Sequence, residues 1–169
     1  MKHSDYWRPI KTFLITGAYL GYIPRIPGTA ASFSVVIGYA LLVGIFPLAI
    51  ARGLFTAGIV MATFLGFLLT EYAATVLFKT KDPQPMVLDE ISGMGISLIP
   101  VIVLDPVAIS YGRWSVYLMA AFVFFRCLDI LKPGLIGRID KSKMRYHIML
   151  DDMVAGFFTA LIMYVLIKL

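Results

Sequence analysis

The chain has 169 residues, of which 60% are hydrophobic and 15% are charged, and its mean hydropathy is +0.87. A soluble domain of this composition would have too little polar surface to cover its core, so a membrane protein is expected. The net charge of +5 is also found in nucleic-acid-binding proteins, but the basic residues are predicted to gather at one face of a membrane, so nucleic acid is not expected as a partner.

The first 28 residues are basic, aromatic and only moderately apolar. Aromatic rings mixed with cations suit the headgroup layer of a bilayer, so an interfacial helix is predicted over about residues 7–19. A signal peptide is the competing interpretation, but the first long apolar run begins only after Gly28 and shows no clear cleavage site. We expect one membrane-embedded domain over residues 1–169, with residues 1–28 as its interfacial lead.

Two long apolar segments follow, over residues 30–50 and 54–78. Each has at least the roughly 20 residues that a helix needs to cross the hydrocarbon core of a bilayer. Thr29 is a plausible N-cap for the first helix, and residues 51–53 are predicted to form the tight turn between the two. Glu71 lies inside the second segment, where a charge is costly, so it is expected to face the protein interior or to be hydrogen-bonded and partly neutral.

The second half of the chain contains one short and two long apolar segments. Residues 91–104 number only 14, too few at about 1.5 Å per residue for a core of about 30 Å, so this helix is extended, kinked at Pro100 or short and buried. Residues 114–131 form the next span, which Pro133 stops, and residues 152–169 form the last. The predicted fold is all-α: a polytopic membrane bundle of about five helices, one short or kinked, plus an N-terminal interfacial helix.

The basic residues orient this bundle in the membrane. With the N-terminus inside, twelve lysines and arginines fall on the inner side and three on the outer side, which is a strong positive-inside signal. The same orientation brings five acids that border apolar segments to the inner face. The inner bases are Lys2, Arg8, Lys11, Arg25, Lys79, Lys81, Arg126, Lys132, Arg138, Lys141, Lys143 and Arg145, and the outer ones are Arg52, Arg113 and Lys168.

These five acids are predicted to converge on one site. Packed together without a metal, they would repel one another and some would be protonated. Charged oxygen ligands favour a hard cation such as Mg²⁺ or Mn²⁺, whereas a single cysteine and two separated histidines make zinc improbable. We therefore predict a metal site formed by Asp89, Glu90, Asp129, Asp151 and Asp152.

Basic side chains are predicted among these acids, where they suit the phosphate oxygens of a lipid headgroup. Three helices are also expected to begin at this face, and helix N-termini favour anions. Together these features indicate metal-assisted phosphoryl chemistry on a lipid substrate. Two interpretations stay open beside it: the acids cap helices in a structural membrane subunit, or they belong to a small ion-coupled transporter. The predicted phosphate-binding bases are Arg25, Lys81, Arg126, Lys132 and Arg138.

Four motifs follow one another at compatible spacing. They occupy residues 21–32 with Pro27-Gly28-Thr29, residues 81–94 with Asp89-Glu90, residues 125–140 with Arg126, Asp129, Lys132 and Asp140, and residues 148–156 with Asp151-Asp152. In this order they resemble the motifs of the phosphatidylglycerophosphatase A family over nearly the whole chain, which is more specific than any single short pattern.

The resemblance implies a Mg²⁺-dependent phosphatase that converts phosphatidylglycerophosphate to phosphatidylglycerol and phosphate in phospholipid biosynthesis. It further implies a multi-pass protein of the bacterial cytoplasmic (inner) membrane with its active site on the cytoplasmic side. The five carboxylates would be the catalytic and metal-binding residues, and Thr29 would join the five bases as a substrate-binding residue. A CDP-alcohol phosphotransferase is the alternative enzyme, although no Asp-Gly pair of that pattern occurs.

The chain also departs from the family pattern. Residues 144–147 stand where the family usually has a glycine-rich stretch, Ala31 replaces a usual glycine, and Leu135 replaces a usual proline. The first departure changes the loop beside the predicted metal site. His147 in this loop is either a group that assists proton transfer or a headgroup-facing surface residue.

Overall fold

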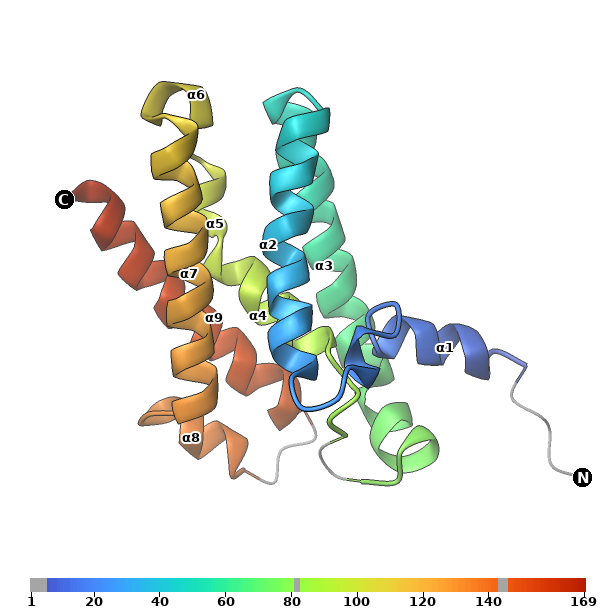
Figure 1. Cartoon of the computed structure of the whole chain (residues 1–169). Coiled ribbons are helices and arrows are strands. Elements are labelled where there is room, and N and C mark those ends of the chain that lie inside the picture. Colours follow the sequence, from blue (N-terminus) through green and yellow to red (C-terminus); the bar gives the residue numbers. More distant parts are fainter. Residues whose placement is uncertain (1–5, 81–82, 143–145) are drawn as a thin grey trace, which may run out of the picture.

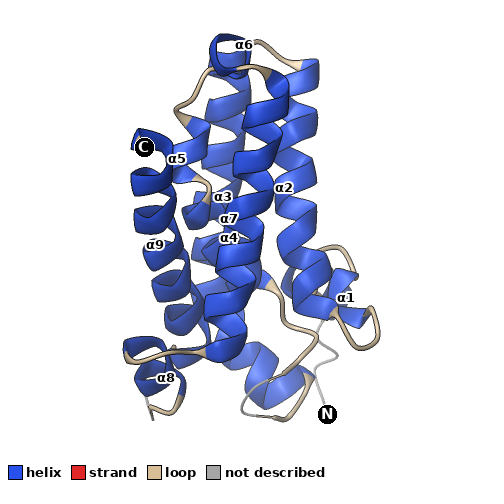
Figure 2. Cartoon of the chain, turned by 60° about the vertical axis from the view of Figure 1, so that its left-hand side comes forward, coloured by secondary structure: helices blue, strands red, loops and turns tan. Residues whose placement is uncertain are grey.

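The computed structural model describes residues 6–80, 83–142 and 146–169, and all regular structure in these ranges is helical (Figure 2). Four of the described helices are long and apolar enough to cross a membrane: α2, α3 with the π-helical turn η2, α7 and α9. The all-α membrane bundle is thus confirmed. The elements are α1 (Arg8–Ile15), the 3₁₀ turn η1 (Leu20–Tyr22), α2 (Pro27–Ile45), α3 (Leu48–Tyr72), η2 (Ala73–Leu77), α4 (Leu88–Ser97), α5 (Ile99–Ile102), α6 (Pro106–Ile109), α7 (Tyr111–Leu131), α8 (Leu135–Asp140) and α9 (His147–Lys168).

The short predicted helix is the centre of the bundle. Helix α4 lies between the α2–α3 pair and the α7–α9 pair and packs against all four (Figure 1). The helix is interrupted at Leu98, between α4 and α5, because Pro100 lacks the N–H that would continue the α4 ladder. At the far end of α5, the Arg52 guanidinium donates to the carbonyls of Ile102, Val103 and Leu104 at 2.7 to 3.1 Å. One cation of α3 thus satisfies the carbonyls at which this broken helix ends.

Three predicted boundaries are wrong. The turn between the first two spans lies at Phe46 and Pro47 rather than at residues 51–53, because proline ends one helix and leaves the preceding residue extended. Helix α2 begins at Pro27, so Thr29 lies within its first turn instead of capping it. Helix α9 begins at His147, five residues before the predicted start of the last span.

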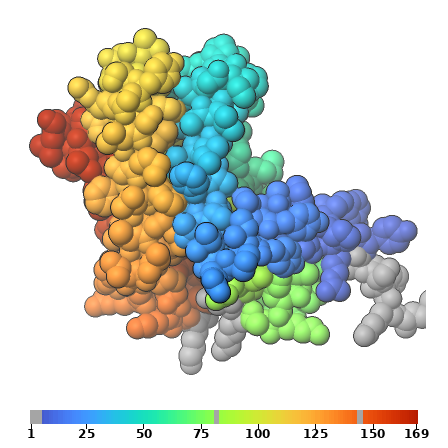
Figure 3. All heavy atoms as spheres, in the orientation of Figure 1, coloured from blue at the N-terminus to red at the C-terminus, as the bar shows by residue number. Residues whose placement is uncertain are grey.

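Helix α1 forms within the stretch predicted as an interfacial helix, and it is shorter than expected, over Arg8–Ile15. It runs across the long helices at one end of the bundle and projects to the side (Figures 1 and 3). The side chains of Trp7, Ile10 and Phe13 are exposed there, and the ammonium of Lys11 lies 4.2 Å from the centre of the Tyr72 ring. Such a mixture of exposed rings and cations suits the headgroup layer.

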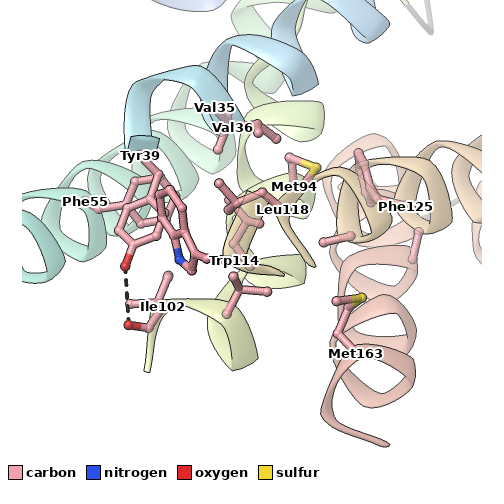
Figure 4. Packing of buried hydrophobic residues seen from close by; sticks show 14 of the residues in the cluster. Val35, Val36, Tyr39, Phe55, Met94, Ile102, Trp114, Leu118, Phe125 and Met163 are labelled. Atoms are coloured by element: carbon pink, nitrogen blue, oxygen red, sulfur yellow. Dashed lines mark hydrogen bonds between the residues drawn. The ribbon is translucent and has the colours of Figure 1, made fainter. Parts of the chain in front are cut away.

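The main apolar core is formed by buried side chains of α2, α3, α4, α5, α7 and α9, and it reaches α8 through Ile136. The Tyr39 ring packs against Phe55 and Trp114, with ring centres 4.8 and 5.8 Å apart, and its hydroxyl donates to the Ile102 carbonyl at 3.3 Å (Figure 4). The rings of Tyr39, Phe55 and Trp114 thus pack together in the interior of this core.

Candidate active site

A cavity of about 550 Å³ opens at the end of the bundle where α2, α4 and α9 begin and α7 ends. Its lining is unusually rich in ionisable groups for a membrane bundle, and intramembrane charges of this kind mark functional sites. The described acids and bases that line it are Asp89, Glu90, Asp129, Asp140, Asp151, Asp152, Arg25, Arg126, Lys132 and His147.

Three of these carboxylates form a group that can hold a metal ion. Asp89, Glu90 and Asp152 each offer an oxygen, and these oxygens all lie within 4.8 Å of one another. One oxygen of Asp89 and one of Glu90 are buried without a hydrogen-bond partner. Buried carboxylates so close together need a counter-charge, and the all-oxygen donor set fits a hard divalent cation. The chemistry of these residues therefore fits a bound metal.

Glycines bring the carboxylates of this group together. A Cβ on Gly93 would lie 2.5 Å from the Asp152 carbonyl oxygen, and one on Gly156 would meet the Gly93 backbone. Helices α4 and α9 can therefore approach closely only because both positions lack a side chain. This contact places the first turn of α4, with Asp89, beside the second turn of α9.

Arg126 connects the acids to α2. Its guanidinium lies 2.5 Å from a carboxylate oxygen of Asp129 and 3.5 Å from the Ser32 hydroxyl oxygen, to which it donates. The Nε of Arg126 is buried and has no partner among the described residues. Arg126 thus retains an unused donor and lines a cavity rich in carboxylates.

Lys132 joins two further acids. It follows α7 in the left-handed conformation, with φ of 44°, which turns its side chain back toward α9. Its ammonium is hydrogen-bonded to Asp140 and lies 2.6 Å from Asp151. Burial alone would lower the pKa of Lys132, but the two carboxylates outweigh burial and raise it. The same contact holds the pKa of Asp140 below its ordinary value.

Not all the predicted residues come together. Thr29 and Arg25 line the cavity, whereas Arg138 is exposed on α8 and does not line it. Lys81 lies outside the described residues. Of the two alternatives for Glu71, the interior position is wrong, because Glu71 is exposed in the last turn of α3.

Two ionisable lining residues were absent from the predicted site, Asp140 and His147. Asp140 belongs to the third of the four motifs, so the sequence contained a signal for it. His147 stands in the departure from the family pattern, so the motifs gave no place for it at the site. In the structure it is the first residue of α9.

The family model described as phosphatidylglycerophosphatase A matches residues 13–167, which includes every element that forms the cavity. The chain belongs to this family. As a member it is a phosphatase, a phosphoric monoester hydrolase, in a membrane-type helical bundle.

Two curated relatives align with this chain over most of their length. A protein of Bacteroides thetaiotaomicron named putative phosphatidylinositol-3-phosphatase is 32% identical over 146 residues, which are 85% of this chain and 85% of the relative. The phosphatidylglycerophosphatase A of Escherichia coli K12 is 30% identical over 165 residues, which are 97% of this chain and 85% of the relative. No solved structure matches the chain significantly.

Proposed function

We propose that the protein is a Mg²⁺-dependent lipid phosphatase that hydrolyses phosphatidylglycerophosphate to phosphatidylglycerol and phosphate in phospholipid biosynthesis. The observation that carries the proposal is the group of Asp89, Glu90 and Asp152 beside the unused donor of Arg126, in one cavity at the end of a membrane bundle. We further propose the bacterial inner membrane as its location and the cytoplasmic side as the side of the site, as the positive-inside signal supports.

In this proposal Asp89, Glu90 and Asp152 hold the metal, and each has an oxygen that lies near the other two. Bound there, Mg²⁺ would act as a Lewis acid on the phosphoryl oxygens. Arg126 donates its free N–H to the phosphate and neutralises charge that grows as the bond to the glycerol oxygen breaks. Arg126 can be positioned for this because Asp129 holds its guanidinium through the Nη1 nitrogen.

Asp151 has a different part from its neighbour Asp152. One of its oxygens is held by Lys132, and the other is buried without a partner. This free oxygen is available to accept a proton or a hydrogen bond from a group in the cavity. We assign Lys132 and Asp140 the role of holding Asp151 in this position.

The choice of headgroup rests on the family and on the Escherichia coli relative, whose name specifies phosphatidylglycerophosphate. The Bacteroides relative is named for a different lipid phosphomonoester. Both names describe a phosphate ester on a lipid headgroup, which is the chemistry that the carboxylate group and Arg126 suit. Phosphatidylinositol 3-phosphate is therefore the comparison substrate.

The test is phosphate release by the purified full chain in mixed micelles of detergent and lipid. Phosphatidylglycerophosphate, phosphatidylinositol 3-phosphate and phosphatidic acid are supplied separately, each with Mg²⁺ or with excess chelator. We expect the highest kcat/KM for phosphatidylglycerophosphate and loss of turnover on chelation, restored by added Mg²⁺. A higher kcat/KM for either other lipid contradicts the headgroup assignment, and full turnover under chelation contradicts the metal.

A further inference from the structure

Two apolar side chains at the mouth of the charged cavity have no role in the chemistry above. Among the described residues that line it, only Ile26 and Ile130 are both apolar and exposed, at 54% and 67% of their surface. Ile26 directly precedes α2, and Ile130 lies in the last turn of α7. Exposed apolar residues are ordinary on a membrane helix, but here they border a site built of carboxylates and bases.

Two other sides of the cavity are closed by contacts between described residues. Between α4 and α9 the backbones meet at Gly93 and Gly156. Toward α8, Lys132 joins Asp140 to Asp151. Among the described lining residues, the exposed apolar side chains stand on the side between α2 and α7.

Above this opening the two helices touch again. The rings of Phe33 on α2 and Phe122 on α7 pack edge to face with centres 5.4 Å apart, and Arg126 reaches Ser32 just below them. Helices α2 and α7 lie side by side on the near face in Figure 3. The opening thus lies between the helix ends and this contact, on the side that faces lipid.

A row of apolar side chains continues from the opening along α7. Val123 and Val116 stand seven and fourteen residues before Ile130, so all three share one face of the helix. A shallow apolar groove of about 530 Å³ follows this face. Its lining consists of Ser115, Val116, Met119, Ala120, Val123 and Phe124.

We propose that the diacylglycerol part of the phospholipid substrate leaves the cavity between α2 and the last turn of α7, past Ile26 and Ile130. An acyl chain then lies along the α7 groove. This inference rests on the proposed lipid phosphatase activity and adds where the lipid sits. It fits the charge distribution, because the phosphate remains beside Arg126 while the apolar part of the same molecule meets the isoleucines and the membrane.

The experiment places a bulky maleimide on a cysteine at the opening. Cys127 is exposed and would react, so Cys127→Ser is the background. Ile130→Cys is the test variant, and Leu131→Cys is its control: Leu131 is 75% exposed on the same helix end, but it does not line the cavity. One residue along a helix turns the label by about 100° around the axis, away from the opening.

The readout is kcat/KM for long-chain phosphatidylglycerophosphate and for glycerol 3-phosphate, a soluble phosphomonoester without acyl chains. The label at position 130 should lower kcat/KM for the long-chain lipid about tenfold or more and change the soluble reaction little, because it obstructs only remote binding. The label at position 131 should change neither. The proposed opening is contradicted if labelling position 130 leaves kcat/KM for the lipid unchanged. It is also contradicted if the label lowers kcat/KM equally for both substrates.

A binding measurement keeps the inference testable without turnover. A bimane fluorophore on Ile130→Cys should be quenched saturably by phosphatidylglycerophosphate with brominated acyl chains. On Leu131→Cys, this lipid should quench the fluorophore no more than brominated phosphatidylcholine does. Equal quenching at both positions overturns the opening. Failure of the unmodified protein to release phosphate would instead contradict the proposed function, so the two failures are distinguishable.

Discussion

Asp151 and Asp152 are adjacent in the chain, yet the helix directs them to different partners. Successive residues on a helix point about 100° apart. Asp152 therefore joins the group that could hold a metal ion, while Asp151 meets Lys132. The five predicted carboxylates thus have different partners: Asp129 pairs with Arg126, and Asp89, Glu90 and Asp152 form the group that could hold a metal ion.

This division leads to a prediction for isosteric substitutions. Asp89→Asn and Asp152→Asn should each lower kcat by about 100-fold or more, because several kcal/mol of metal-dependent stabilisation depends on these charges and each 1.4 kcal/mol is tenfold. Folding should change little. The measurement is phosphate release beside the melting temperature in detergent.

The matched control for these variants is Asp105→Asn. The Asp105 carboxylate caps α6 by accepting from the Val107 N–H at 2.9 Å, and asparagine caps about equally well. Its activity should equal that of the unmodified protein. Near-normal rates in both site variants at normal stability would contradict the carboxylate group.

The pair of Lys132 and Asp140 predicts a pH effect on stability. Its hydrogen bond to Lys132 holds the Asp140 pKa below its ordinary 3.8, so the charged carboxylate stabilises the fold. This contribution is complete above 3.8 and is lost as the pH falls through the lower folded pKa. Asp140→Asn should therefore lower the melting temperature by about 2–4 °C near neutral pH, since a partly exposed pair contributes about 1 kcal/mol or less.

The difference in melting temperature between the unmodified protein and Asp140→Asn should shrink as the pH falls below about 4. The control is the same substitution in a Lys132→Met background, where the coupling between the two side chains is absent and the pH trend should disappear. A difference that stays constant down to the lowest pH would show that this ion pair does not produce it.

At the scale of elements, the contact between α4 and α9 decides the site. Gly156→Ala would bring its Cβ to 3.1 Å from the Gly93 Cα and closer still to the Gly93 carbonyl oxygen. We expect a loss of about 1–3 kcal/mol from overpacking, together with reduced turnover because Asp89 and Asp152 are displaced. Thermal unfolding and phosphate release measure the two effects.

Gly44→Ala is the control for this change. Nothing lies within 4 Å of a Cβ at Gly44 on α2, and alanine is favoured over glycine in a helix by about 1 kcal/mol. This variant should be as stable as the unmodified protein or slightly more so. If both alanines behaved alike, the close approach of α4 and α9 would not be needed for activity.

At the scale of the whole molecule, the bundle predicts a topology. The Lys132 end of α7 and the start of α9 lie at one end, and the C-terminus emerges toward the other (Figure 1). A reporter before Met1 or in the loop after α8 should be cytoplasmic, and one after Leu169 should be outside. Accessibility to impermeant reagents measures this. If the loop reporter reacted with impermeant reagents from outside, the predicted topology and the cytoplasmic placement of the active site would both be contradicted.

The sequence by itself determined the properties that depend on local composition. Apolar runs specified the membrane helices, because a span must be about 20 residues of low polarity wherever it packs. The basic residues indicated an orientation, and the four motifs indicated the family, which the match over residues 13–167 confirms. The sequence also predicted that five acids share one end of the bundle: Asp89, Glu90, Asp129, Asp151 and Asp152.

Only the tertiary structure decided which of those acids meet. Hydropathy carries no information on how a helix is rotated about its axis, so it could not separate Asp151 from Asp152. It also could not show that Gly93 and Gly156 allow α4 and α9 to touch, since that contact joins residues far apart in the chain. Distances between side chains of different helices follow from packing, and packing belongs to the folded bundle as a whole.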